Sequence, residues 1–163
     1  MSNAGFSYTT EHKDNQVMYK CSGVLDERAK WEGNEAEGAA VVSLDMADIT
    51  LVNSIGIQTW LKFLRGLTPT CKVTYQACGL RVVNQLNLFS ILMTERPTRV
   101  ASFQAPYECE ACDETQIVSL SPENLIKTAA GFDPPQRMCP KCSKPLAFAA
   151  IAAKYFLFVQ KQA

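Results

Sequence analysis

The chain has 163 residues, in which 16 lysine and arginine residues balance 16 aspartate and glutamate residues. This length fits one domain, or one domain with a small additional module. The lack of net positive charge argues against nonspecific binding to nucleic acid, and an apolar fraction of 47% is too high for a disordered chain. No apolar stretch approaches the ~18 residues of a membrane-spanning helix, so we expect no membrane insertion.

The first residues contain no basic segment followed by an apolar one, so we expect no secretory signal. The protein is therefore expected to be cytoplasmic, where thiols stay reduced. The chain nevertheless contains seven cysteines. Because that number is odd and the compartment is reducing, these cysteines need an explanation other than disulfides.

The first part of the chain predicts a hairpin followed by a buried strand. Residues 5–11 and 16–21 are rich in aromatic, threonine and valine residues, which favours an opening β-hairpin. A short helix is predicted over Asp26–Trp31, with Asp26 as its N-cap. The apolar run 39–46 then predicts a buried central strand.

Helices and strands alternate in the following stretch. Apolar residues three or four positions apart predict two amphipathic helices, the first capped by Asn53 or Ser54. The predicted ranges are helices 54–67 and 80–89 and strands 71–76 and 100–107. This alternation predicts an α/β fold over residues 1–105, in which helices pack on a mixed β-sheet.

Four cysteines form two C-x-x-C pairs, Cys109 with Cys112 and Cys139 with Cys142. Each pair directs two thiolates at one ion, and two pairs complete the tetrahedral shell of a structural Zn(II) site. Four thiolates leave no open position for water, so we do not expect a catalytic metal. Iron in a rubredoxin-like site and a thioredoxin-like dithiol use similar motifs and stay as alternatives.

Residues 106–163 are therefore predicted to form a zinc-ribbon module with a closing helix. Its hairpin strand is predicted at 116–120, and Ser121 is expected to begin a short helix. The segment 147–159 is apolar nearly all round, which predicts a C-terminal helix packed on the sheet or between the modules. Alternatively, an uncovered apolar helix would bind a partner or form a homodimer.

The remaining cysteines are expected to be buried core residues, because each lies in or beside a predicted strand. They are Cys21, Cys71 and Cys78. His12 is the only histidine and is expected to be exposed. No Ser/His/Asp set, P-loop or Gly-x-Gly-x-x-Gly motif is present, so we do not expect an enzyme.

The stretch Asn53-Ser54-Ile55-Gly56-Ile57 follows a predicted central strand and opens a helix. It resembles the Asp-Ser-Ser/Thr-Gly-Leu motif of the STAS domain, which is named for sulfate transporters and anti-sigma factor antagonists. The segments Ser22–Asp26 and Gly79–Leu88 resemble the second strand and third helix of that family. The resemblance covers about residues 5–105 and implies a STAS-like fold. Together with the ribbon it also resembles a group of bacterial proteins.

The resemblance implies a phosphorylation or partner site at Asn53, Ser54 and Gly56. In anti-sigma factor antagonists, a kinase partner phosphorylates the serine that follows the aspartate, and the added charge breaks the partner interface. Here Asn53 replaces that aspartate, and Ile55 replaces the second hydroxyl residue. Two alternatives stay open, because these residues could only cap the helix or could bind another anion.

We therefore predict a non-enzymatic regulatory protein that binds a protein partner, such as a kinase or an anti-sigma-like regulator, near Asn53–Gly56. The zinc would be structural. A nucleic-acid-binding ribbon is the alternative. Residues 106–163 contain as many acidic as basic residues and lack the stripe of lysine and arginine that nucleic-acid recognition needs.

Overall fold

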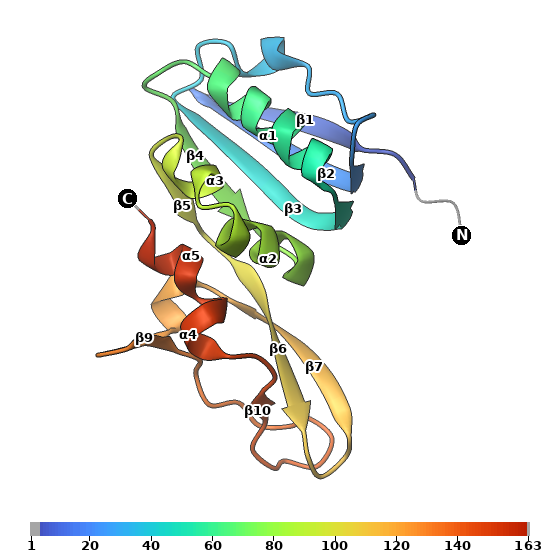
Figure 1. The fold of residues 1–163 in the computed structure, drawn as a ribbon, viewed down its shortest axis with the longest axis vertical. Helices are drawn as coiled ribbons and strands as arrows, with labels where there is room; N and C mark the ends of the chain where they lie inside the picture. The colour runs from blue at the N-terminus through green and yellow to red at the C-terminus, as the bar shows by residue number, and fades with distance from the viewer. Residues whose placement is uncertain (1–3, 163) are drawn as a thin grey trace.

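The computed structural model describes residues 4–162 and shows two larger sheets joined along the chain, together with a small two-stranded sheet (Figure 1). The first sheet has five strands in the order β1-β2-β3-β4-β5. β1 is antiparallel to β2, and the other neighbours are parallel. Its strands are β1 (Ser7–Lys13), β2 (Gln16–Leu25), β3 (Val41–Val52), β4 (Lys72–Gln76) and β5 (Thr98–Val100). The prediction of a mixed α/β fold is confirmed.

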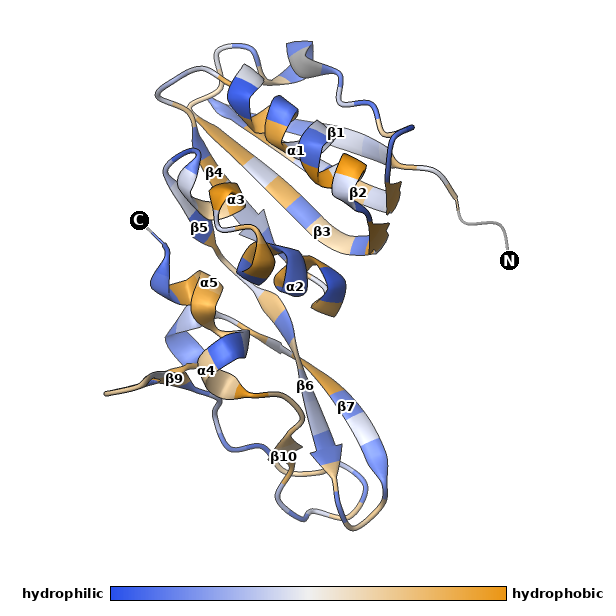
Figure 2. Ribbon diagram, viewed as in Figure 1, coloured by the Kyte–Doolittle hydropathy of each residue, from blue (hydrophilic) through white to orange (hydrophobic). Residues whose placement is uncertain are grey.

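Helices cover one face of this sheet, because parallel strands need crossover connections. They are α1 (Ser54–Gly66), α2 (Leu80–Leu88) and α3 (Ile91–Thr94). Along β3, apolar and polar residues alternate (Figure 2). Val42, Leu44 and Met46 are fully buried, whereas the intervening residues of β3 are only half-buried. The two predicted amphipathic helices are therefore confirmed, and their apolar sides form the core with the sheet.

The C-terminal end of α1 is capped by a side chain from a distant loop. The Arg96 guanidinium donates to the carbonyl oxygens of Leu64 at 2.7 Å and Leu67 at 2.5 Å. It also donates to the carbonyl of Thr68. The last carbonyls of a helix have no partner within the helix, so Arg96 joins the α3–β5 connection to the end of α1.

The predicted helix over Asp26–Trp31 is wrong. Asp26 does not cap a helix there, because its carboxylate accepts the backbone N–H of Arg28 at 2.9 Å, which closes a turn. A 3₁₀-helix, η1 (Gly33–Ala36), forms instead. The central strand β3 also continues to Val52, beyond its predicted end at residue 46, because it stays paired with the end of β2.

The predicted strand over 100–107 is divided between the two sheets. β5 ends at Val100, and β6 (Phe103–Cys109) begins the second sheet. The two sheets meet at Cys78, whose backbone carbonyl oxygen accepts a hydrogen bond from the N–H of Gln104 at 2.8 Å. The second sheet is antiparallel, with the order β10-β6-β7; its other strands are β7 (Glu114–Leu120) and β10 (Ala147–Phe148).

The single C-terminal helix predicted over 147–159 is wrong. The segment forms β10, α4 (Ala152–Tyr155) and α5 (Leu157–Gln160). Asn87 of α2 explains the break, because its amide donates to the carbonyl of Tyr155 at 2.7 Å and accepts the N–H of Phe158 at 2.9 Å. These bonds satisfy backbone groups between the two short helices. The remaining elements are η2 (Pro122–Asn124), where a helix was expected to begin, β8 (Ile126–Thr128) and β9 (Gly131–Asp133).

The C-terminal segment packs between α2 and the second sheet. Phe156 and Phe158 are fully buried and lie 6.0 and 5.0 Å from Phe103, measured between ring centroids. The Tyr155 hydroxyl donates to the carbonyl of Gln104 at 2.6 Å. The prediction of a homodimer depended on an uncovered apolar helix, and this segment is largely covered within the chain.

The other expectations concern single residues. Cys21, Cys71 and Cys78 are buried, as predicted, and His12 is exposed. None of the helices formed by residues 4–162 is long and apolar enough to cross a lipid bilayer.

Candidate functional site

The four cysteines of the C-x-x-C pairs lie together where β6 ends at Cys109, and β6 runs away from the first sheet (Figure 1). Their four Sγ atoms are within 4.8 Å of one another. Cys109 lies 3.5 Å from Cys112 and from Cys142, and Cys112 lies 3.7 Å from Cys139, all measured between Sγ atoms. A tetrahedral shell with Zn–S bonds of ~2.3 Å places its sulfurs ~3.8 Å apart. The thiols therefore already have nearly the spacing that Zn(II) requires.

The two turns that carry these thiols have the same backbone conformation. The residue after each second cysteine is left-handed, with φ values of 55° at Asp113 and 58° at Ser143. The N–H of Asp113 donates to the carbonyl oxygen of Cys109 at 2.8 Å, and the N–H of Ser143 donates to the carbonyl oxygen of Cys139 at 2.9 Å. Each turn thus folds its second thiol back toward the first. The C-x-x-C spacing predicted the pairs but not these left-handed residues.

The four thiols influence one another's ionisation. Burial alone would raise the pKa of the Cys109 thiol, but hydrogen bonds from the Cys112 backbone and from neighbouring thiols lower it to about 7. The pKa of Cys112 is raised, chiefly by its hydrogen bonds with the Cys142 and Cys109 thiols. One thiolate forms readily, whereas several adjacent thiolates need a compensating cation. A bound divalent metal ion would supply that charge.

An ion pair joins the two turns outside the cluster. The Lys141 ammonium contacts the Glu114 carboxylate. Lys141 lies between Cys139 and Cys142, and Glu114 is the first residue of β7, so the contact links the two cysteine turns. Both side chains are well exposed to solvent, and a pair of this kind contributes little to stability. This contact could not be predicted from the sequence, because nothing in the spacing places Lys141 and Glu114 together.

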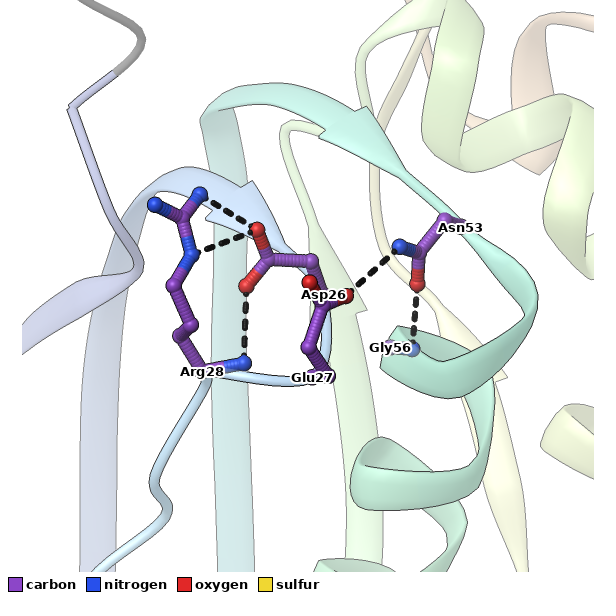
Figure 3. Close-up of polar contacts among 5 residues, drawn as sticks. All are labelled: Asp26, Glu27, Arg28, Asn53 and Gly56. Atoms are coloured by element: carbon purple, nitrogen blue, oxygen red, sulfur yellow. Dashed lines mark hydrogen bonds and ion pairs between the residues drawn. The ribbon is translucent and has the colours of Figure 1, made fainter.

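The second candidate site is the start of α1, where Asn53 connects three chain segments (Figure 3). Its side-chain oxygen accepts the N–H of Gly56 at 2.8 Å, and its side-chain nitrogen donates to the Glu27 carboxylate at 3.2 Å. Its own N–H donates to the carbonyl of Leu25 at 3.1 Å. The predicted N-cap is therefore confirmed at Asn53, and the cap also holds the loop that follows β2.

Gly56 allows the close approach of α1 to the end of β2. A Cβ atom at this position would lie 1.9 Å from the carbonyl oxygen of Leu25. Gly56 is buried, whereas Ser54 and Ile55 in the same helical turn are exposed. The Ser54 hydroxyl makes no side-chain hydrogen bond with any residue in the described range 4–162. It is therefore open to solvent at the start of α1.

An acidic loop with one paired arginine lies beside this helix start. The Arg28 guanidinium donates to the buried Asp26 carboxylate at 3.0 and 2.5 Å (Figure 3). These hydrogen bonds hold the pKa of Asp26 below its usual value. No sequence motif marks Glu27 or Arg28, so neither residue could be predicted at this site. The Arg28 guanidinium is already bound to the Asp26 carboxylate. It therefore gives no support to the alternative that the start of α1 binds another anion.

Comparisons with known proteins do not assign the chain to a family. No protein-family model matches the chain, and a search of curated proteins finds no significant match. Among solved structures, the chain is similar to an anti-sigma factor antagonist from Mycobacterium paratuberculosis, with 16% sequence identity and a TM-score of 0.45. The match covers 58% of this chain and 85% of the antagonist.

Proposed function

We propose that the protein is a non-enzymatic regulatory module that binds a protein partner at the start of α1, around Asn53, Ser54 and Gly56. One observation carries the proposal, which is the exposure of Ser54 at the start of α1, close in the chain to two exposed apolar residues. Leu51 is 39% exposed and Ile55 is 42% exposed. Exposed apolar side chains near a hydroxyl suit a protein interface better than a catalytic site.

Phosphorylation of Ser54 is the proposed switch, with a kinase or an anti-sigma-like regulator as the partner. A phosphate adds ~1.5–2 negative charges at the helix start. The Glu27 carboxylate, which accepts from Asn53, lies at the same helix start. The helix N-terminus favours the phosphate, whereas Glu27 repels it. The added charge would therefore alter the surface on which the partner docks.

Affinity capture tests this proposal with the full chain as bait. Wild type and Ser90→Glu are expected to retain the same partner. Ser90 is the matched control because it is another exposed serine at a helix start, directly before α3, and lies outside the proposed interface. Ser54→Glu and Ile55→Arg are expected to lose it. If both retain the partner, the proposed interface is wrong. If only Ile55→Arg loses it, the interface stands and the phosphorylation switch is wrong.

We further propose that Cys109, Cys112, Cys139 and Cys142 bind one structural Zn(II) ion, in a unit spanning 106–163 beside a STAS-like unit spanning 1–105. The spacing of the sulfurs supports the metal site. Elemental analysis is expected to find one zinc per chain and no iron. Cys139→Ser is expected to lose the metal, whereas Cys71→Ser, which removes a buried thiol outside the cluster, keeps it. A metal-free wild type would contradict the proposal.

The state of the cysteines supports a reducing compartment. None of the seven forms a disulfide, and four of them lie close enough to bind one metal. A cytoplasmic location is therefore part of the proposal, since free thiols persist there. To test this location, cells that express the chain are fractionated and the protein is detected with an antibody; it is expected in the cytoplasmic fraction.

A further inference from the structure

β7 forms one edge of the second sheet. The strand order β10-β6-β7 leaves β7 with one neighbour, and its seven residues pair with β6 without a register shift. Within residues 4–162, β7 pairs with no strand other than β6. In Figure 1, β7 follows the outer margin of the lower half. One side of its backbone is therefore free to pair with another strand.

The hydrogen bonds of β6 identify the free backbone groups of β7. The N–H of Ala149 donates to the carbonyl of Pro106 at 2.9 Å, so Pro106 faces β10. Backbone groups alternate in direction along a strand, which means that Ala105 and Tyr107 face β7. Their partners on β7 are Val118 and Gln116. The intervening residues of β7 therefore point their N–H and C=O groups away from the sheet; they are Thr115, Ile117 and Ser119.

This edge lacks the features that normally prevent pairing. Proteins protect edge strands with charged residues, proline or bulges. β1, an edge of the first sheet, ends in Glu11, His12 and Lys13. By contrast, β7 carries no lysine, arginine or proline, and its one charged residue is Glu114 at the first position. The centre of β7 is thus an uncharged template for another strand.

We propose that β7 pairs with β7 of a second copy of this chain, antiparallel and centred on Ile117. In this register Ile117 faces Ile117 of the partner subunit, and Thr115 faces Ser119 of the partner subunit. Each pair joins outward-facing groups, so the three pairs exchange about six backbone hydrogen bonds. The result is one continuous sheet through both copies.

Side chains support the second copy as the occupant. Ile117 is 47% exposed and lies beside Pro106 on the outer face of the sheet. The two-fold axis brings both Ile117–Pro106 pairs into one apolar stripe, and it pairs hydroxyl with hydroxyl on either side. Glu114 faces the apolar Leu120 of the partner subunit, so no like charges lie directly opposite. The strand is therefore complementary to itself.

Sedimentation or light scattering over a concentration series tests the proposal with the full chain, purified without chelator. The strand interface is small, so a dimer with Kd on the order of 10–100 µM is expected. The wild-type mass should rise from 18.0 kDa toward twice that value. Ile117→Lys and Ile117→Glu should each weaken the dimer about tenfold or more, because like charges then meet at the two-fold axis.

An equimolar mixture of Ile117→Lys and Ile117→Glu distinguishes lost pairing from misfolding. The mixture should form a heterodimer, because opposite charges now meet at the axis. Ile126→Lys is the matched control, since Ile126 is 55% exposed on β8, and it should dimerise like wild type. The proposal is overturned if wild type stays at 18.0 kDa, if Ile117→Lys dimerises as well as Ile126→Lys, or if the mixture stays monomeric.

Discussion

Gly56→Ala provides a sharp test of how α1 is held on the sheet. In the wild type, the start of α1 rests against the backbone carbonyl of Leu25. The added Cβ atom would lie 1.9 Å from that oxygen, where real Cβ atoms keep at least 3.0 Å. Either the end of β2 or the start of α1 has to move, because a backbone oxygen cannot turn away as a flexible side chain can.

The magnitude follows from two opposing effects. Alanine is favoured over glycine in a helix by ~0.8–1.0 kcal/mol. The movement weakens the Asn53 cap, which is worth ~1 kcal/mol, and overpacking adds ~1–3 kcal/mol. The hydrogen bond from the Asn53 N–H to Leu25 also lengthens from 3.1 Å. We therefore expect a net loss of about 1–3 kcal/mol in the free energy of unfolding.

Urea denaturation, followed by circular dichroism, measures this loss, and Gly66→Ala is the control. Gly66 lies in the same helix, and a Cβ atom there meets nothing within 4 Å. The control should be unchanged or stabilised by up to ~1 kcal/mol. If Gly56→Ala is as stable as Gly66→Ala, the contact between α1 and Leu25 is not as close as described, and the reasoning fails.

Three further changes test polar contacts around α1 by urea denaturation. Asn53→Ala should cost about 1 kcal/mol by removing the cap, and an unchanged midpoint would contradict that role. Arg96→Ala should cost about 2 kcal/mol, because several carbonyls at the end of α1 lose a charged donor; Arg96→Lys should recover only part. Because the pKa of Asp26 is lowered in the folded protein, the ionised carboxylate stabilises the fold at pH values above its unfolded pKa of ~3.9. This stabilisation is lost as the pH falls through the folded pKa. Wild type should therefore lose more stability than Arg28→Ala from about pH 5 to pH 3, and equal losses would contradict this coupling.

Local patterns were sufficient for most elements of the first sheet. The apolar spacing in 54–67 and 80–89 predicted α1 and α2, because one side of each helix has to face the core. The C-x-x-C spacing predicted which four thiols meet, since each pair is a local turn and two turns complete one tetrahedral shell. The cap at Asn53 was also predicted, because capping involves residues only three positions apart.

Local patterns failed where distant segments decide the conformation. The stretch 100–107 alternates like a single strand, but its two parts join different sheets. The segment 147–159 has the composition of one helix, and Asn87 divides it by binding backbone groups at its middle. Asp26 closes a turn with Arg28 where helix capping was expected. At 100–107 the choice of pairing partner divides the strand. In the other two cases a side-chain contact outweighs a helix propensity of only a few tenths of a kcal/mol per residue.

The sequence by itself thus determined the balance of charges, the alternation of strands and helices, and the grouping of seven cysteines into four candidate ligands and three core residues. These features depend on composition and short spacings. Only the tertiary structure decided that Ser54 is exposed at a helix start where Asn53 binds Glu27, and that β7 has a free edge. Exposure and edge position depend on which segments pack beside a residue, and packing partners far apart in the chain leave no local periodicity to detect.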